Sequence, residues 1–167
     1  MPETPAGLLA RLAALGIRAR TTEHPPVFTV TESQALRGVL PGGHAKNLFL
    51  KPKAGPFLLV VLEEDAKVSV NALGRAVGLG RVSFGSAEEL YAQLGVEPGS
   101  VTPFGMVNAA PGAVRLVFDQ HLMQGFEQVN FHPLTNTATT TLSPAELLRF
   151  LASLGHEATM LDLASLT

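Results

Sequence analysis

The stretch "AKNLFLKPKAGPFLLVVLEE", residues 45–64, decides the fold. It contains two apolar runs, 45–51 and 57–64, separated by a link that holds two prolines and a glycine. Short apolar runs bounded by such residues are typical of buried strands, and a short link favours neighbours in one sheet. We therefore expect two adjacent strands here, with Lys46 and Asn47 at the start of the first.

The rest of the chain mixes helix and strand signals. Thr4 stands before Pro5 in the order expected at a helix start, and Ser86 with Glu89 forms a capping-box pattern. We expect helices over 5–15, 31–40, 69–77, 86–95 and 143–155, and further strands over 17–24, 104–110, 113–120, 127–134, 136–142 and 158–161. Because several adjacent strands have short links, the sequence predicts one α/β domain, residues 1–167, with a central mixed β-sheet flanked by helices.

The composition excludes several classes of function. A chain of 167 residues that is 46% hydrophobic and 16% charged is typical of a compact globular domain. The net charge of -2 argues against a broad basic face, so we expect no DNA partner. We read no signal peptide and no apolar run of membrane-spanning length, and we expect a cytoplasmic protein without a membrane partner.

The sequence offers no familiar metal, cofactor or nucleophile motif. There is no cysteine, which rules out a thiol nucleophile and a thiolate metal site. The five histidines do not fall at metal-ligand spacing, so we expect no metal. No GxSxG elbow is present, and the glycines of 78–85 depart from the dinucleotide-binding pattern, so we expect no cofactor.

Two stretches place polar or constrained residues where a ligand could bind. Lys46 with Asn47 at a strand start can hold a carbonyl or phosphate oxygen, although a lysine there can also simply point into solvent. In "PGSVTPFG", 98–105, Gly99 and Pro103 bound a tight loop. Its backbone N–H groups can face a ligand, or the loop is an ordinary turn before a strand.

A third candidate is the stretch "NFHPLTNTATT", 130–140. His132 precedes a proline, which favours an extended backbone at the histidine. Its imidazole can hydrogen-bond an ester, an amine or a water, or it can be satisfied by loop backbone.

Together these stretches resemble the YbaK/ProX superfamily of aminoacyl-tRNA editing domains. The matching strings are "EHPPVFTV", "GGHAKNLFLK", "GRVSFG", "LGVEPGSVTPFG" and "NFHPLTNTATTTLS", in this order along nearly the whole chain. The sequence is most similar to the freestanding prolyl-tRNA editing proteins of the ProX type, which hydrolyse alanyl-tRNA(Pro). The resemblance implies a partly barrel-like mixed sheet and deacylation without a metal.

The resemblance also implies roles for individual residues. The essential lysine and the histidine of the family match Lys46 and His132, and its GxxxP loop begins at Gly99, which makes these three the candidate catalytic residues. The candidate substrate-binding residues are Asn47, Ser100, Val101, Thr102, Pro103, Lys51 and Arg81. Lys51 and Arg81 are basic residues that we expect to flank the pocket and contact the tRNA acceptor end. Val101 and Phe104 are candidates for setting the size of the aminoacyl pocket.

The implied activity is trans-editing hydrolysis of mischarged tRNA, with Ala-tRNA(Pro) as the expected substrate and prolyl-tRNA synthetase as a candidate partner. An aminoacyl ester is already activated, so the protein needs to place a water and stabilise an oxyanion. Three alternatives stay open: a deacylase for cysteinyl- or seryl-tRNA, a tRNA-binding module without catalysis, and a small-molecule binding or regulatory domain on the same fold.

Overall fold

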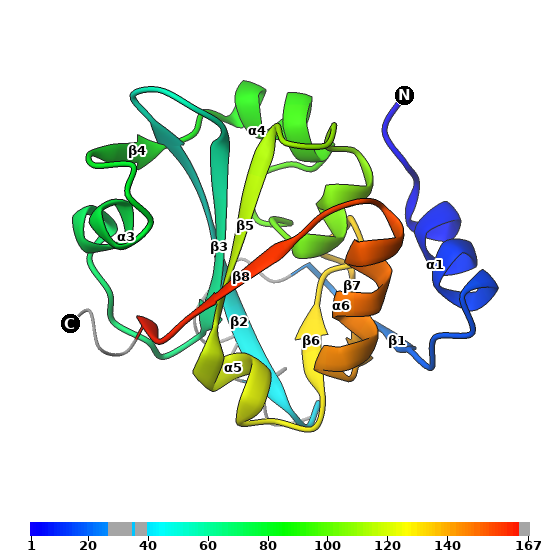
Figure 1. Cartoon of the computed structure of the whole chain (residues 1–167). Coiled ribbons are helices and arrows are strands. Elements are labelled where there is room, and N and C mark those ends of the chain that lie inside the picture. Colours follow the sequence, from blue (N-terminus) through cyan, green and yellow to red (C-terminus); the bar gives the residue numbers. More distant parts are fainter. Residues whose placement is uncertain (27–34, 36–39, 164–167) are drawn as a thin grey trace.

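A mixed β-sheet forms the centre of the computed structural model, which describes residues 1–26, 35 and 40–163. The strands follow the order β1-β7-β6-β2-β3-β5-β8, and β4 pairs with β2 beside this path (Figure 1). Their bounds are β1 (Arg20–Glu23), β2 (Gly43–Pro52), β3 (Phe57–Glu63), β4 (Val82–Phe84), β5 (Val114–Asp119), β6 (Val129–Phe131), β7 (Ala138–Leu142) and β8 (Ala158–Leu161). The pairs β2–β6, β3–β5 and β5–β8 are parallel and the others antiparallel, which confirms the predicted mixed sheet.

The hairpin of β2 and β3 contributes buried side chains to both faces of the sheet. Its two strands are those that the apolar runs predicted. The strands pair antiparallel from Ala45↔Glu63 to Leu50↔Leu58. Alternate side chains point to opposite faces. Phe49 belongs to one buried cluster and Leu50 to another. The sheet is therefore buried on both sides at its centre.

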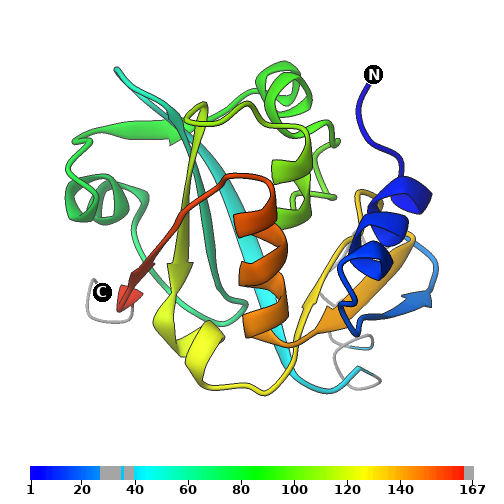
Figure 2. The same ribbon diagram turned by 45° about the vertical axis from the view of Figure 1, so that its right-hand side comes forward.

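Helices cover the two faces unequally. The larger cluster joins the sheet to α1 (Pro5–Ala14), α4 (Ala87–Leu94), α5 (Gln120–Gln124), α6 (Pro144–Ser153) and the short 3-10 helix η1 (Pro103–Val107). The smaller cluster joins the other face to α3 (Val70–Ala76). Figures 1 and 2 show α3 on one side of β2, β3 and β5, and α1, α4 and α6 on the other.

The predicted helix starts are confirmed by their caps. The Thr4 hydroxyl accepts from the backbone N–H of Gly7, and Ser86 with Glu89 forms both bonds of a capping box. The helix that begins at Ala87 ends where Gly95 takes a φ of 68°, a left-handed conformation that glycine adopts without strain. Local side chains therefore set these helix ends, which is why sequence alone located them.

One sequence prediction is wrong, and another is right except at its ends. The strand expected over 104–110 is instead η1, because Pro103 starts a helical turn and the Thr102 hydroxyl accepts from the Phe104 N–H at 3.2 Å. The strand expected over 113–120 ends at Asp119, whose carboxylate caps the unpredicted helix α5. The helix expected over 31–40 lies almost wholly outside the described residues.

Within the described ranges, no helix combines the length and apolar character that a membrane crossing requires.

Candidate active site

The sheet splits beside β2, the strand that carries Lys46 and Asn47. β2 pairs with β6 only at Gly43↔Val129 and His44↔Asn130, and with β4 only over its last three residues. Between these contacts, residues 45–48 have β3 on one side and no strand of the described chain on the other. A gap in the middle of a sheet exposes backbone and side chains that a continuous sheet would cover.

Asn130 fixes the point where the two strands separate. This side chain is buried, and its Nδ2 donates to the carbonyls of Pro41 and Gly43 at 3.0 and 3.1 Å. Its Oδ1 accepts from the Thr141 hydroxyl at 2.6 Å. The amide thus ties the start of β2 to β6 and β7, and the strands diverge beyond it.

Lys46 and His132 lie on the same face of the sheet. His44 and Asn130 are register partners; Lys46 stands two positions further along β2, and His132 stands two positions after Asn130, one residue beyond the end of β6. Because side chains alternate with a period of two, Lys46 and His132 share the face of His44 and Asn130. The half-buried Lys46 ammonium donates to the Ala66 carbonyl. An ammonium has three N–H donors, so two stay available to a ligand.

The backbone fixes the tautomer of His132. Its Nδ1 lies 3.0 Å from the Ala138 carbonyl oxygen, which can only accept, so Nδ1 carries the hydrogen. Burial lowers the pKa of His132 below its usual value, the bond to Ala138 raises it in part, and the nearby His24 lowers it further. The imidazole is therefore neutral at pH 7 and presents a bare Nε2 acceptor.

Sequence reasoning missed His24, which the structure brings beside His132. Their ring centroids are 6.2 Å apart. Nδ1 of His24 lies 2.8 Å from the Pro25 carbonyl, and its Nε2 lies 2.8 Å from the Thr139 hydroxyl. The one sequence feature that could have marked His24 was its position at the end of the strand predicted over 17–24. The pairing of β1 with β7, which decides its neighbours, has no local signature in the sequence.

The Gly99 loop approaches the turn that follows His132. Gly99 has a φ of 93°, and a Cβ added there would lie 3.8 Å from Nδ2 of Asn136. The Ser100 N–H is already bonded to the Glu97 carbonyl, and Pro103 has none to offer. In the described chain, the exposed Gly99 and the half-buried Val101 keep N–H groups without a partner.

Other residues of this loop hold its shape. Thr102 and Ser100 are buried, and the Thr102 hydroxyl caps η1. Phe104 is completely buried and packs edge-on against Phe131 and Phe150. Phe104 therefore supports the core, and Val101 is left as the loop side chain that could border a pocket.

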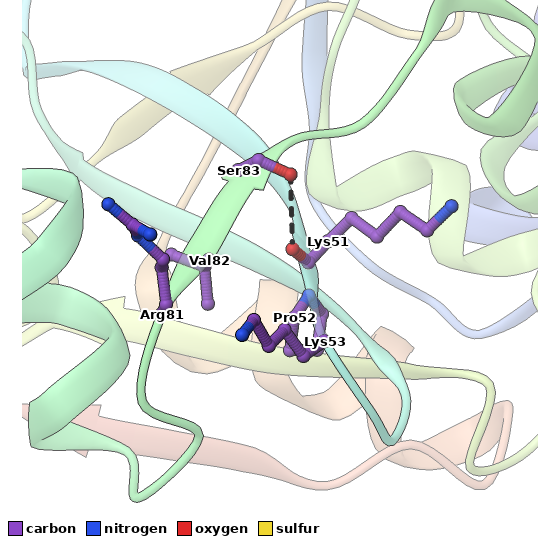
Figure 3. A pocket seen from close by; sticks show the side chains of 6 residues that line it. All are labelled: Lys51, Pro52, Lys53, Arg81, Val82 and Ser83. Carbon is purple, nitrogen blue, oxygen red and sulfur yellow. Dashed lines mark hydrogen bonds between the residues drawn. The ribbon is translucent and has the colours of Figure 1, made fainter.

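Lys51 and Arg81 lie away from the split, at the far end of β2. Five residues of strand separate Lys46 from Lys51, which corresponds to about 17 Å. The Lys51 ammonium lies 2.7 Å from the Glu89 carboxylate, and this contact is the largest cause that lowers the pKa of Glu89 to about 2. Arg81 and Lys51 border an open pocket of about 400 Å³ with Lys53, and Figure 3 shows the Lys51 side chain directed away from Arg81.

Asn47 carries the unexplained polar atom of the site. By alternation its side chain lies on the face opposite Lys46. Its Oδ1 is buried and has no hydrogen-bond partner. A buried polar atom without a partner destabilises the fold, and such atoms are found most often at functional sites.

No group of three or more histidine, aspartate or glutamate side chains that could hold a metal ion occurs in the part of the chain that the structure describes.

Comparison with known proteins identifies the family of the chain. The model of the aminoacyl-tRNA editing domain matches residues 24–150. The chain is 40% identical over 165 residues to prolyl-tRNA synthetase associated domain-containing protein 1 of Bos taurus, covering 96% of this chain and 95% of that protein. It is 33% identical over 150 residues to the prolyl-tRNA editing protein ProX of Acetoanaerobium sticklandii, covering 89% and 91%.

The fold is shared with a solved structure described provisionally as a trans-editing enzyme for prolyl-tRNA synthetase. The TM-score is 0.71 at 23% identity, over 96% of this chain and 98% of the other. The chain therefore belongs to the family of aminoacyl-tRNA editing domains, which confirms the resemblance read from its sequence motifs.

We predict that Asn47→Leu stabilises the fold. Leucine has a similar size and removes the buried, unpartnered oxygen, so the free energy of unfolding should rise by about 1 kcal/mol. For a chain of this length that is about 3 °C in Tm. Thr141→Val is the matched control, because it deprives the buried Asn130 Oδ1 of its donor and should lower Tm. A lower Tm for both variants would contradict the prediction.

We predict that His132 makes the fold sensitive to acid. The pKa of His132 is lowered in the folded state, so the unfolded state binds more protons once the pH falls below about 6.5. Its contribution to stability is complete above that pH and is lost as the pH falls through the folded pKa. His132→Gln should flatten the fall in Tm between about pH 7.5 and 5. Parallel curves for wild type and His132→Gln would rule this out.

Proposed function

We propose that the chain, residues 1–167, hydrolyses the ester of mischarged tRNA, with Ala-tRNA(Pro) as substrate, and acts as a trans-editing deacylase in the cytoplasm. The observation that carries this proposal is the pair on one sheet face: the Lys46 ammonium with spare donors, and the neutral His132 with a bare acceptor. Family membership supports the same assignment. The reaction uses no metal or other cofactor, and its macromolecular partners are the tRNA acceptor end and, as a candidate, prolyl-tRNA synthetase.

The chemistry needs a placed water and a stabilised oxyanion. Water attacks the ester carbonyl carbon, and the electron pair of the C=O bond moves onto oxygen. When the carbonyl reforms, the bond to the ribose oxygen breaks, and the proton lost by the water passes to that oxygen. Alanine and tRNA with a free 3′ end are released. Positioning and electrostatic stabilisation suffice for such an activated ester.

Lys46 binds an oxygen of the substrate in this scheme. Its contact with the Ala66 carbonyl, in the segment that follows β3, fixes the ammonium while two N–H donors stay free. These donors suit the ester carbonyl oxygen or the phosphate of the terminal nucleotide. A fixed positive charge in a half-buried site gains more from such an oxygen than it would in water.

His132 binds the α-ammonium group of the alanine. A neutral Nε2 accepts from an ammonium donor, and the lowered pKa keeps that acceptor available. The same lowered pKa makes His132 a weak general base. We therefore assign the water to the Gly99 loop, whose free N–H groups at Gly99 and Val101 can orient it, with help from the ribose 2′-hydroxyl.

Selection against proline rests on size. Alanine is smaller than proline, so a tight pocket can reject the correct amino acid by a steric clash. Val101 borders the loop and is our candidate for the pocket wall. Glycine and serine esters would fit the same space. A missing methylene changes the binding free energy by only about 1–3 kcal/mol, and a small apolar pocket rejects an added hydroxyl only weakly. The identity of the tRNA must therefore supply further selection.

Lys51 and Arg81 are our candidates for contacts with the acceptor stem. Lys51 lies about 17 Å along β2 from Lys46, and Arg81 borders the same pocket as Lys51. Lys53 borders the same open pocket and adds charge there (Figure 3). With a net charge of -2, the chain would rely on such a local patch and make few phosphate contacts.

We predict that Lys46→Ala lowers kcat/KM for Ala-tRNA(Pro) by at least about 100-fold, because a donor to the developing charge is lost. Release of labelled alanine measures this directly. Arg20→Ala removes an exposed cation on the edge strand β1 and should leave the rate within about twofold. Turnover by Lys46→Ala within a few-fold of wild type would overturn the assignment of Lys46.

We predict that Arg81→Ala raises KM and leaves kcat unchanged, because a contact with the stem holds substrate and transition state equally. The slope of log affinity against log salt concentration should become shallower by about one, as expected when one phosphate contact is lost. Arg18→Ala, an exposed cation before β1, is the control and should change neither value. A loss of kcat at constant KM would instead assign Arg81 to the reaction centre.

A further inference from the structure

The backbone of β2 itself faces the split, and its direction follows from three hydrogen bonds. The His44 carbonyl accepts from Glu64, just beyond β3, at 2.9 Å. The Gly43 N–H donates to Gln128 at 2.8 Å, and the Phe49 carbonyl accepts from Gly85 at 2.9 Å, both on the opposite edge. In an extended strand, N–H and C=O of one residue point to the same edge and successive residues alternate.

Odd-numbered residues of β2 therefore direct their backbone groups into the split. Ala45 presents its C=O there, and two residues further Asn47 presents its N–H and C=O. No strand of the described chain covers this edge at 45–48. The Oδ1 of Asn47, on the face of the sheet opposite Lys46, is buried and also lacks a hydrogen-bond partner. The unpaired main-chain groups of this edge therefore suit a ligand that carries both donors and acceptors.

The pattern on this edge is complementary to adenine. Its Watson–Crick edge places the N6 amino donor beside the N1 acceptor, which matches a C=O followed by an N–H. Unpaired RNA ends are commonly recognised on this edge of the base, and exposed sheet edges bind ligands through main-chain bonds. Guanine and hypoxanthine present the reverse order, with an oxygen acceptor beside an N–H donor. The edge thus discriminates among bases without a base-reading side chain.

We propose that Ala45 C=O and Asn47 N–H bind the 3′-terminal adenine of the substrate. This inference rests on the proposed function, because the ester is attached to the ribose of that same nucleotide. Lys46 stands between the two residues and directs its ammonium to the face where the ester is held. The adenine then lies in the plane of the sheet and the ester lies beside Lys46. The ribose of the same nucleoside joins the two groups. Asn47 is a substrate-positioning residue through its main chain.

The test uses wild-type protein and alanyl-esterified acceptor minihelices that differ only in the terminal base. Relative to adenosine, purine riboside lacks the N6 donor, and inosine reverses the pattern. Each should lower kcat/KM, with inosine the worse by about tenfold or more. 7-Deazaadenosine alters only the other edge of the base and should react within about twofold of adenosine.

Equal turnover of all four esters would overturn the inference while leaving the proposed function intact. A loss confined to 7-deazaadenosine would also overturn it, because the opposite edge of the base would then be read. If even the adenosine ester were stable, the proposed function would fail, and this inference with it.

A pair of variants tests the main-chain donor directly. Asn47→Ala removes the side chain and keeps the N–H, whereas Asn47→Pro also removes the N–H without breaking a bond to β3, because that N–H faces the split. The preference for adenosine over inosine should persist in Asn47→Ala and fall below about threefold in Asn47→Pro. An unchanged preference in a folded Asn47→Pro protein would contradict the proposal. The substrate series decides the question if that variant does not fold.

Discussion

The buried amide of Asn130 is the constraint on which the site depends. It holds the start of β2 against β6 and β7 through three hydrogen bonds, and the strand pairing ends directly beyond it. The separation that follows leaves part of β2 without a neighbouring strand of the described chain on one edge, and His132 and Lys46 lie on a shared face. A buried, fully bonded side chain is suited to this task, because losing any of its partners would leave a polar group unsatisfied.

The site resembles a binding surface more than a set of reactive groups. Lys46 offers donors, His132 offers an acceptor of fixed tautomer, and the Gly99 loop offers backbone N–H groups. None of them is a nucleophile activated by a neighbour, which agrees with a substrate that is already an activated ester. The basic residues near β4 are separate from this chemistry, and Lys51 also ties β2 to α4 through Glu89.

Sequence patterns located most elements, because their signals are local. The β2–β3 hairpin, the caps at Thr4 and Ser86, and the strand β8 follow from neighbouring residues. Family motifs marked Lys46, His132 and the Gly99 loop as candidates. What the sequence could not predict depends on contacts between distant segments: the split beside β2, the approach of His24 to His132, the buried Oδ1 of Asn47, and the position of Arg81 far from Lys46. The expected strand at 104–110 failed because a proline and a threonine cap outweighed its apolar character.

The most direct test of the account is the release of labelled alanine from Ala-tRNA(Pro) by the wild-type protein, with Pro-tRNA(Pro), Cys-tRNA(Pro) and Ala-tRNA(Ala) measured alongside. The account predicts rapid loss of alanine from Ala-tRNA(Pro) and slow loss from the other three. Preferential loss from the cysteinyl ester would keep the site and contradict the assigned substrate. Binding of tRNA with no hydrolysis of any ester would contradict the central claim that the split beside β2 is a catalytic site.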